Sequence, residues 1–336
     1  MSTLLEVENL AVDLPLSAGT LHAVRGISFT AHRGETLCIV GESGCGKSLT
    51  SLAIMNLLPG IAIRKADKMV FNGEELQDLN ERQMSNIRGD KIGMIFQEPM
   101  TSLNPAFTIG NQLMEVLLRH RKVSRAAARD RAIYLLEKVG ITAAASRLNQ
   151  YPHQLSGGLR QRVMIAMTLM CEPDLIIADE PTTALDVTIQ AQILLLLAEL
   201  QREFDMGVIL ITHDLGVVAR VADMVAVMYA GEIVEEGTAD EIFNNPTHPY
   251  TQGLLNCIPI PGKTERGAHL GSIPGIVPSL IGDIKGCSFS ERCRYASDAC
   301  TLGSFELKVI SAGTHRYRCM LSAEQCSFNA KTLGDT

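Results

Sequence analysis

The stretch that most constrains this chain is a glycine-rich run at residues 41–48, Gly-Glu-Ser-Gly-Cys-Gly-Lys-Ser. A short apolar run, Thr36–Val40, precedes it, and residues 49–55 are good helix formers without proline or glycine. A strand, a glycine loop and a helix in this order predict a loop whose successive N–H groups point at one anion. The helix start adds further unpaired N–H groups. The sequence therefore predicts a phosphate-binding loop, the alternative being a plain glycine turn.

Two side chains of this loop have predicted roles in binding a nucleotide and its metal ion. The ammonium of Lys47 can reach the outer phosphates, and the hydroxyl of Ser48 can bind Mg²⁺. The residues expected to bind the nucleotide here are Gly41, Glu42, Ser43, Gly44, Cys45, Gly46, Lys47, Ser48 and Leu49.

Composition excludes several classes of protein. The 336 residues predict about two domains, and a net charge of −7 argues against binding nucleic acid by bulk charge. Aromatic residues make up 4% and tryptophan is absent, which disfavours stacking platforms for single-stranded nucleic acid. We expect neither a membrane-spanning segment nor a signal peptide, and therefore a protein of the cytosol. In that compartment, nine cysteines do not form a disulfide framework.

Hydrophobic patterning predicts an α/β fold with an antiparallel sheet at the start of the chain. Strands are expected at residues 4–14, 21–30, 36–40, 67–72, 91–96, 175–178, 208–212, 223–229 and 232–235. A helical pattern covers 107–149, and residues 123–139 place Ala127, Ile133, Leu136 and Val139 on one side. A further helix is expected at 187–204, with Leu194–Leu197 in the core.

The chain is expected to divide near residue 258. Residues 1–258 form the first domain, with a helical subdomain at about 98–170, and residues 259–336 form a small loop-rich domain that holds five cysteines. Proline and glycine are frequent after residue 258, which breaks any long helix.

Four polar residues at or near the ends of predicted strands match the needs of nucleotide hydrolysis. Asp179 can bind Mg²⁺ and Glu180 can act as general base toward a water molecule. Gln97 can bridge metal and water, and His213 can contact the γ-phosphate. Because parallel strands end at one edge of a sheet, these residues can meet there. Singly, each could equally be a solvated turn or edge residue.

A second glycine-led helix start is predicted at Ser156, Gly157 and Gly158. This is another anion-binding arrangement. One triphosphate needs one cradle from its own subunit. The second start therefore predicts a site that is completed across a head-to-tail dimer.

With these motifs in this order, residues 4–258 resemble the ATP-binding-cassette (ABC) ATPases, whose signature is matched by residues 155–158. The resemblance implies a P-loop ATPase with a RecA-like core, an antiparallel β subdomain and a helical subdomain. It implies that the signature caps the γ-phosphate of a partner subunit and that Asp186 lies at the dimer contact. His213 becomes the switch histidine, and Gln97 a lever toward a membrane partner. An aromatic base-stacking residue is missing near Leu14, with His22 nearby.

Three further stretches resemble the ATPases of bacterial dipeptide, oligopeptide and nickel importers: residues 97–105, 248–251, and 273–275 with Pro278. The resemblance implies an ATP-hydrolysing subunit at the cytoplasmic face of the inner membrane. Its partners would be a second ATPase subunit, either a copy or a paralogue, two transmembrane permease subunits and a substrate-binding protein, without nucleic acid. The rivals are a cassette ATPase of DNA repair or translation and a regulatory module without turnover. The absence of long coiled-coil insertions disfavours DNA repair, and the single signature disfavours translation. The presence of Glu180 and His213 disfavours a module without turnover.

Four cysteines of the tail form a candidate metal-binding set. Cys287, Cys293, Cys300 and Cys319 alternate with arginines, and Cys326 could replace one of them. Four thiolates can hold zinc or a [4Fe–4S] cluster, and free thiols are the third possibility. The resemblance to dipeptide-importer ATPases, whose tails can bind such a cluster, favours [4Fe–4S]. The other cysteines, Cys38, Cys45, Cys171 and Cys257, are expected in core or loop positions.

Overall fold

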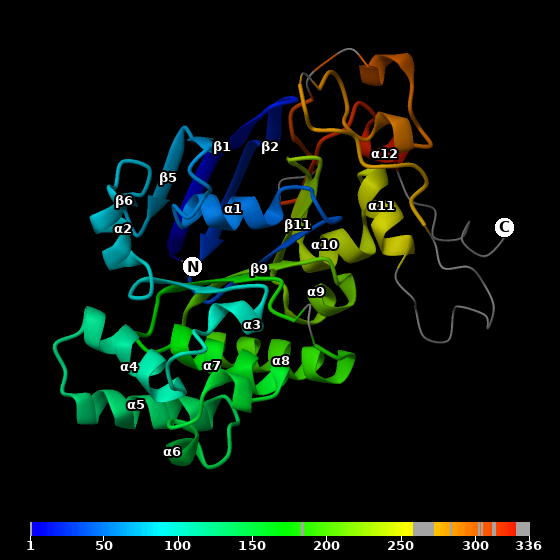
Figure 1. Ribbon diagram of the computed structural model, residues 1–336. Helices are drawn as coiled ribbons and strands as arrows, with labels where there is room; N and C mark the ends of the chain where they lie inside the picture. The colour runs from blue at the N-terminus through cyan, green and yellow to red at the C-terminus, as the bar shows by residue number, and fades with distance from the viewer. Residues whose placement is uncertain are drawn as a thin grey trace. The chain divides into compact units, whose positions relative to one another are not determined.

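The computed structural model describes residues 2–182, 185–257, 272–282, 284–301, 303, 305–310 and 314–326 (Figure 1). The chain divides into two compact units, which we describe separately. Unit 1 contains Met1–Leu5, Thr30–Thr36 and Val70–Ile211. Unit 2 contains Glu6–Phe29, Leu37–Met69 and Thr212–Thr336.

Unit 1 contains three parallel strands, β7 (Ile92–Ile95), β8 (Leu175–Asp179) and β9 (Gly207–Thr212). β8 pairs with β7 on one side and with β9 on the other, where Asp179 is the register partner of Ile211. Every residue of β8 and β9 is buried, as expected for continuous apolar runs covered on both faces. The three strands predicted here are confirmed, and β8 delivers Asp179 to its carboxyl end.

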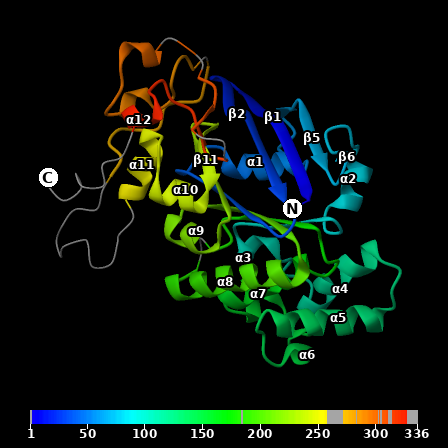
Figure 2. The ribbon, with the colours of Figure 1, turned by 180° about the vertical axis from the view of Figure 1, so that it is seen from behind.

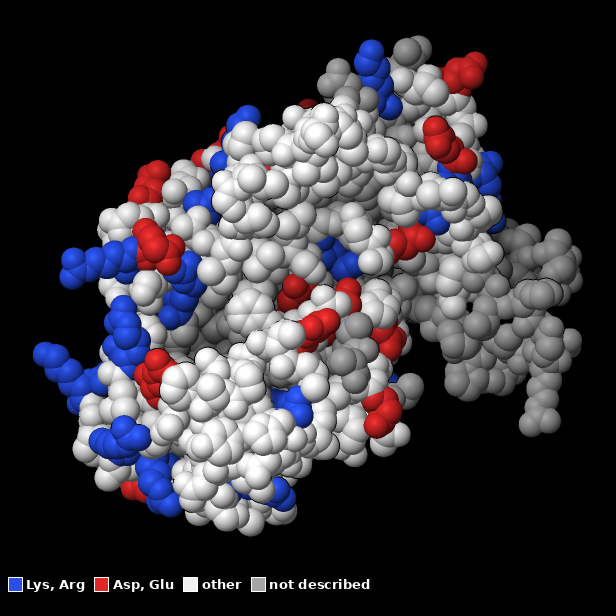
Figure 3. Space-filling view, in the orientation of Figure 1, with Lys and Arg blue, Asp and Glu red and all other residues white. Residues whose placement is uncertain are grey.

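The predicted helical segment of unit 1 consists of α3 (Pro99–Ser102), α4 (Ile109–His120), α5 (Arg125–Lys138), α6 (Ala144–Arg147) and α7 (Gly157–Thr168). α5 packs against both α4 and α7 (Figure 1). The side chains of Thr108 and Ser124 cap α4 and α5 by accepting a backbone N–H. In the view of Figure 3, Lys and Arg side chains gather on the surface where α2 (Glu81–Ile87), α4 and α5 lie.

Two details of the predicted helices are wrong. On α5 the buried face is Ala128, Ala132, Leu135 and Leu136, whereas Ala127 is exposed. On α8 (Val187–Phe204), Leu194, Leu196 and Leu197 are buried but Leu195 is 52% exposed. Successive residues of a helix point about 100° apart, so four in a row do not share one buried face.

In unit 2, the strand β3 (Thr36–Val40) runs parallel to β10 (Met224–Tyr229), with Val40 opposite Val227. β11 (Glu232–Thr238) returns antiparallel to β10. The two central residues of the turn, Ala230 and Gly231, have φ of +48° and +82°, which fits the tight turn that matches strand twist. The predicted final pair of strands is thereby confirmed. The helix α1 (Lys47–Ile54) follows β3, and α10 (Ala239–Asn244) packs against β11 (Figure 2).

The strands at the start of the chain belong to a five-stranded sheet. They are β1 (Thr3–Leu16), β2 (Gly19–His32), β4 (Ile63–Lys65), β5 (Lys68–Phe71) and β6 (Glu74–Glu75). β4 pairs antiparallel with β1, and β6 pairs antiparallel with β5. The predicted antiparallel opening is confirmed. Within the described ranges, no helix is both long and apolar enough to cross a membrane.

The described part of the tail joins unit 2 through backbone pairing. β13 (Arg316–Tyr317) pairs antiparallel with β11, and β12 (Lys308–Val309) pairs with β13. The rest consists of loops, the 3₁₀ turns η2 (Ser290–Arg292) and η3 (Asp298–Thr301), and α12 (Ala323–Cys326). This part is loop-rich, as predicted; the expected boundary near residue 258 lies outside the described residues.

Candidate functional site

The phosphate loop of unit 2 closes around Lys47. Its side chain is buried, and Nζ donates to the carbonyls of Gly41 at 2.8 Å and Glu42 at 3.0 Å. α1 begins at Lys47 with Gly46 at its N-cap, and no described side chain caps it. The N–H groups at this helix start therefore face the loop, as an anion-binding helix start requires.

Two loop glycines are required because other backbone lies against them. A Cβ on Gly46, whose φ is +102°, would lie 2.3 Å from the carbonyl oxygen of Ala23. A Cβ on Gly41 would lie 2.1 Å from the carbonyl oxygen of Met228. Larger residues at either position would displace the loop.

Glu42 is held by two residues that the sequence did not point out as part of the site. Its N–H donates to the hydroxyl of Tyr250 at 2.9 Å. Its carboxylate accepts both Nη atoms of Arg292, at 2.6 and 3.0 Å. Tyr250 belongs to the stretch 248–251, which resembles a subfamily motif, and Arg292 is one of the arginines that alternate with the tail cysteines. The sequence carries no signal that joins either of them to Glu42.

The carboxyl end of β8 in unit 1 brings Gln97 and Glu180 together. Nε2 of Gln97 donates to Oε2 of Glu180 at 3.2 Å. Glu180 has a left-handed backbone, with φ of +43°, and its N–H donates to the carbonyl of Ile211 at 2.9 Å. Asp179, the preceding residue, is buried. A non-glycine residue in this conformation is strained, which is common at functional positions.

The two glycines of the signature start α7 with Ser156 as N-cap, and the hydroxyl of Ser156 accepts the N–H of Leu159. Asp186 caps α8 by accepting the N–H of Ile189 at 3.2 Å. A Cβ on Gly158 would lie 3.1 Å from Cγ2 of Ile189, so the two helix starts lie against each other. Ser156 and Asp186 are both exposed. Unit 1 therefore presents the signature and Asp186 side by side; Ala184, two residues before Asp186, lies outside the described residues.

Each unit thus carries one part of the predicted site. Unit 2 carries residues 41–49 and His213, which is exposed just after β9 ends. Unit 1 carries Gln97, Asp179, Glu180, residues 156–158 and Asp186. At the expected base-stacking position, Leu14 is half-buried, and Nδ1 of the nearby His22 lies 2.6 Å from Oδ1 of Asp13. His22 is therefore an edge residue with an acidic partner.

The tail thiols are near enough to affect one another's ionisation. Burial, together with smaller effects of the negative charges of Cys319, Cys300 and Cys293, raises the pKa of Cys287 to about 11. Sγ of Cys326 lies 4.0 Å from Sγ of Cys319, and this hydrogen bond lowers the pKa of Cys319. The described residues nevertheless contain no group of three or more His, Cys, Asp or Glu arranged to hold a metal ion. The predicted [4Fe–4S] or zinc ligands are thus neighbours without the geometry of a ligand set.

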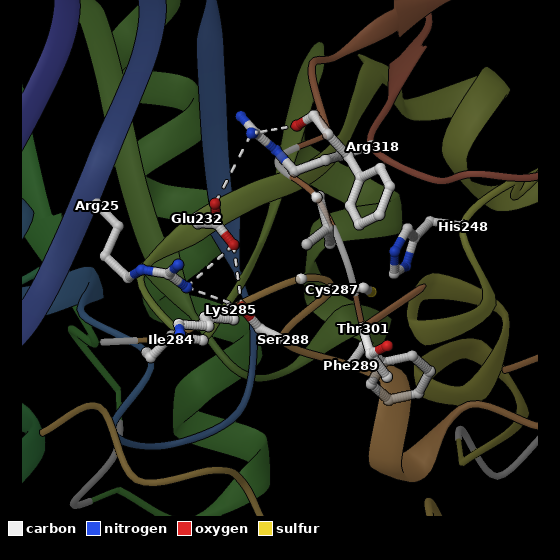
Figure 4. Close-up of a pocket in the computed structure, with 14 residues that line it drawn as sticks. Arg25, Glu232, His248, Ile284, Lys285, Cys287, Ser288, Phe289, Thr301 and Arg318 are labelled. Carbon is white, nitrogen blue, oxygen red and sulfur yellow. Dashed lines mark hydrogen bonds and ion pairs between the residues drawn. The ribbon is translucent and has the colours of Figure 1, made fainter. Parts of the chain in front are cut away.

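A cavity of about 400 Å³ in unit 2 lies beside Cys287. Figure 4 shows Glu232 at its wall, where it accepts hydrogen bonds from Arg25 at 3.1 Å and from Ser288 at 3.0 Å. Nη1 of Arg318 lies 3.7 Å from the same carboxylate. Glu232 therefore ties the tail to β2 and offsets the charge of two arginines.

Comparison with known proteins supports both resemblances, the one to the ABC ATPases and the one to the peptide-importer ATPases. The sequence profile of the family "ABC transporter" matches residues 24–183, and that of "Oligopeptide/dipeptide transporter, C-terminal region" matches residues 234–300. The chain is 51% identical over 336 residues to the dipeptide transport ATP-binding protein DppD of Bacillus subtilis, covering 100% of this chain and 99% of that protein. It is 54% identical over 297 residues to the oligopeptide transport ATP-binding protein OppD of the same organism, covering 88% and 83%.

Solved structures show the same fold. The ATP-binding cassette MJ0796, in a dimeric post-hydrolysis state bound to ADP and Pi, matches with a TM-score of 0.62 and 28% identity. The match covers 70% of this chain and 98% of that one. The fold and the motif order therefore define an ATPase of the ATP-binding-cassette class. Within it, the chain belongs to the family of dipeptide and oligopeptide transport ATP-binding proteins.

Proposed function

We propose that the chain is the ATPase subunit of a bacterial importer of di- or oligopeptides or a related small solute. The observation that carries the proposal is the joint match of one chain to the transporter ATPase and to the peptide-transporter C-terminal region. The second match argues against roles in DNA repair or translation. A nickel or opine importer of the same subfamily is the closest alternative.

In the proposed mechanism, the N–H groups of residues 41–49 and the ammonium of Lys47 hold the phosphates. Ser48, Gln97 and Asp179 would hold Mg²⁺, which neutralises phosphate charge during transfer. Glu180 takes the proton of the water that attacks the γ-phosphorus, and the bond to the ADP oxygen breaks. His213 contacts the γ-phosphate. Gln97, hydrogen-bonded to Glu180, places the metal shell and the base in one network.

We further propose that two such subunits face each other head to tail. Ser156, Gly157 and Gly158 of one subunit then cap the γ-phosphate on the other, and Asp186 lies at the contact. The exposure of Ser156 and Asp186 on adjoining helix starts supports this. The second subunit is a copy or a paralogue.

The proposed location is the cytoplasmic face of the inner membrane, with two permease subunits and a substrate-binding protein as partners. Phe96, Met100 and Phe107 are exposed large apolar residues close in sequence to Gln97. Exposed apolar side chains mark an interaction site where they form a contiguous patch. A permease that contacts them would be linked through Gln97 to Glu180.

For the tail, we propose that Cys287, Cys293, Cys300 and Cys319 hold a [4Fe–4S] cluster, with zinc as the alternative and Cys326 as a substitute ligand. The N–H of Cys287 donates to the carbonyl of Cys300 at 2.8 Å, and Sγ of Cys326 lies 4.0 Å from Sγ of Cys319, so the cysteines of each of these pairs lie close together. Anaerobic purification followed by iron, sulfide and zinc analysis tests the proposal. A brown protein with about four irons per chain is expected; colourless protein with stoichiometric zinc, or with no metal, would reject the cluster.

Uptake of labelled dipeptides by cells that carry Lys47→Ala in the chromosomal copy tests the main proposal. Uptake should be lost because the buried ammonium that closes the loop is removed. Lys65→Ala, which removes an exposed lysine of the same unit, is the control and should transport normally. Normal dipeptide and oligopeptide uptake in Lys47→Ala cells would show that the chain serves another solute or no import at all.

A further inference from the structure

The tail sends one buried arginine to the phosphate loop. The Arg292 side chain is 4% exposed, and its guanidinium binds both carboxylate oxygens of Glu42. Its other donor hydrogens reach the carbonyls of Pro274 at 3.0 Å and Ile273 at 3.2 Å and the hydroxyl of Tyr229 at 3.4 Å. Paired N–H···O bonds from a planar guanidinium are directional and are stronger than bonds between neutral groups. Arg292 is thus fixed by the earlier tail segment that contains Ile273 and Pro274, and it presents a rigid fork to the loop.

Glu42 is held at all three of its polar positions. Arg292 binds its carboxylate, Tyr250 accepts its N–H, and Lys47 donates to its carbonyl at 3.0 Å. The two tyrosines behind it, Tyr250 and Tyr229, pack with ring centroids 4.5 Å apart. A shift of Arg292 would therefore move Glu42, and with it the carbonyl that orients the phosphate-binding lysine.

We propose that Arg292 is a positioning residue for nucleotide binding, through which the cysteine-bearing tail sets the conformation of the phosphate loop. The inference rests on the proposed binding of nucleotide by residues 41–49. Cys293 follows Arg292 directly, so a change at the thiols is transmitted to the loop by the shortest covalent path. By linkage, nucleotide at the loop must stabilise the tail segment to the same degree.

Calorimetric titration of the full-length chain with MgADP tests the proposal. Arg292→Gln should weaken binding about tenfold, as expected for loss of a charge-assisted pair that holds the loop. Arg292→Lys keeps the charge without the fork and should restore part of the affinity. Arg294→Gln removes an exposed cation from the other side of Cys293, where it stacks on Tyr295, and should bind normally.

Glu42→Gln disrupts the same ion pair by changing the loop residue, and it replaces Arg292→Gln in the test if that variant does not fold. It should weaken binding to a similar extent, and the double variant should be no weaker than either single one. Hydrogen exchange measures the coupling between the phosphate loop and the tail directly. MgADP should slow exchange at residues 288–296 in the wild type and not in Arg292→Gln.

Wild-type affinity in Arg292→Gln or in Glu42→Gln would overturn the inference, as would equal losses in Arg292→Gln and Arg294→Gln, which would indicate a general charge effect. Failure of the underlying function is distinguishable. If Lys47→Ala binds MgADP as tightly as the wild type does, the loop itself is not the nucleotide site.

Discussion

Replacing Glu180 by glutamine removes the assigned general base and leaves its surroundings in place. The N–H of residue 180 still donates to Ile211, and a glutamine oxygen can accept from Gln97 as the carboxylate does at 3.2 Å. The φ of +43° is as unfavourable for glutamine as for glutamate. We therefore expect the free energy of unfolding to change by less than about 0.5 kcal/mol. Phosphate release from MgATP should fall about 10²–10⁴-fold, the usual contribution of a positioned base, while MgADP binding is retained.

Glu180→Gly separates chemistry from backbone strain. Glycine relieves about 1–2 kcal/mol of left-handed strain, but it adds about 0.5–1 kcal/mol of chain entropy and loses a hydrogen bond of about 1 kcal/mol. These terms offset, so stability should stay within about 1 kcal/mol of the wild type, with hydrolysis lost as in the glutamine variant.

Glu172→Gln is the matched control, because Glu172 is another glutamate of unit 1 with a left-handed φ of +54°. It should hydrolyse ATP normally. Wild-type phosphate release by Glu180→Gln, measured in the assembled transporter, would refute the assignment of the base.

Three further outcomes follow from other contacts. Gly46→Ala should abolish MgADP binding in calorimetry, because its Cβ would lie 2.3 Å from the carbonyl oxygen of Ala23; retained affinity would mean that the loop can shift freely. His315→Ala should lower the free energy of unfolding in urea by about 1–3 kcal/mol, because the buried carboxylate of Glu235 loses the partner that lies 2.7 Å away and keeps only the N–H groups of Thr247 and His248; an unchanged free energy of unfolding would contradict this. Burial lowers the pKa of His248 from 6.5 to about 4. Between these pH values the unfolded chain binds a proton that the folded chain does not, so the free energy of unfolding should fall as the pH drops, by a total that approaches about 3 kcal/mol. A pH-independent difference in urea denaturation between the wild type and His248→Gln would disprove this.

The parallel strands and the phosphate loop could be predicted from local sequence because their signals are local. Continuous apolar runs such as residues 208–212 indicate strands buried on both faces. Glycines spaced in this way before a helix indicate an anion-binding loop, whatever the helix packs against. The misplacement of Ala127 and Leu195 shows the limit of this approach. Which side of a helix is buried depends on the elements packed against it, and these are distant in sequence.

The sequence by itself determined the order of the motifs, the residue types able to bind phosphate and metal, and the acids at the end of a buried strand. Only the tertiary structure decided which other residues contact these groups. It placed Gln97 on Glu180, set the signature helix start against α8, and brought Arg292 to Glu42 across 250 positions of the chain. Local preference reaches only a few residues, whereas such contacts depend on the path of the whole backbone and on the burial that makes a paired charge favourable.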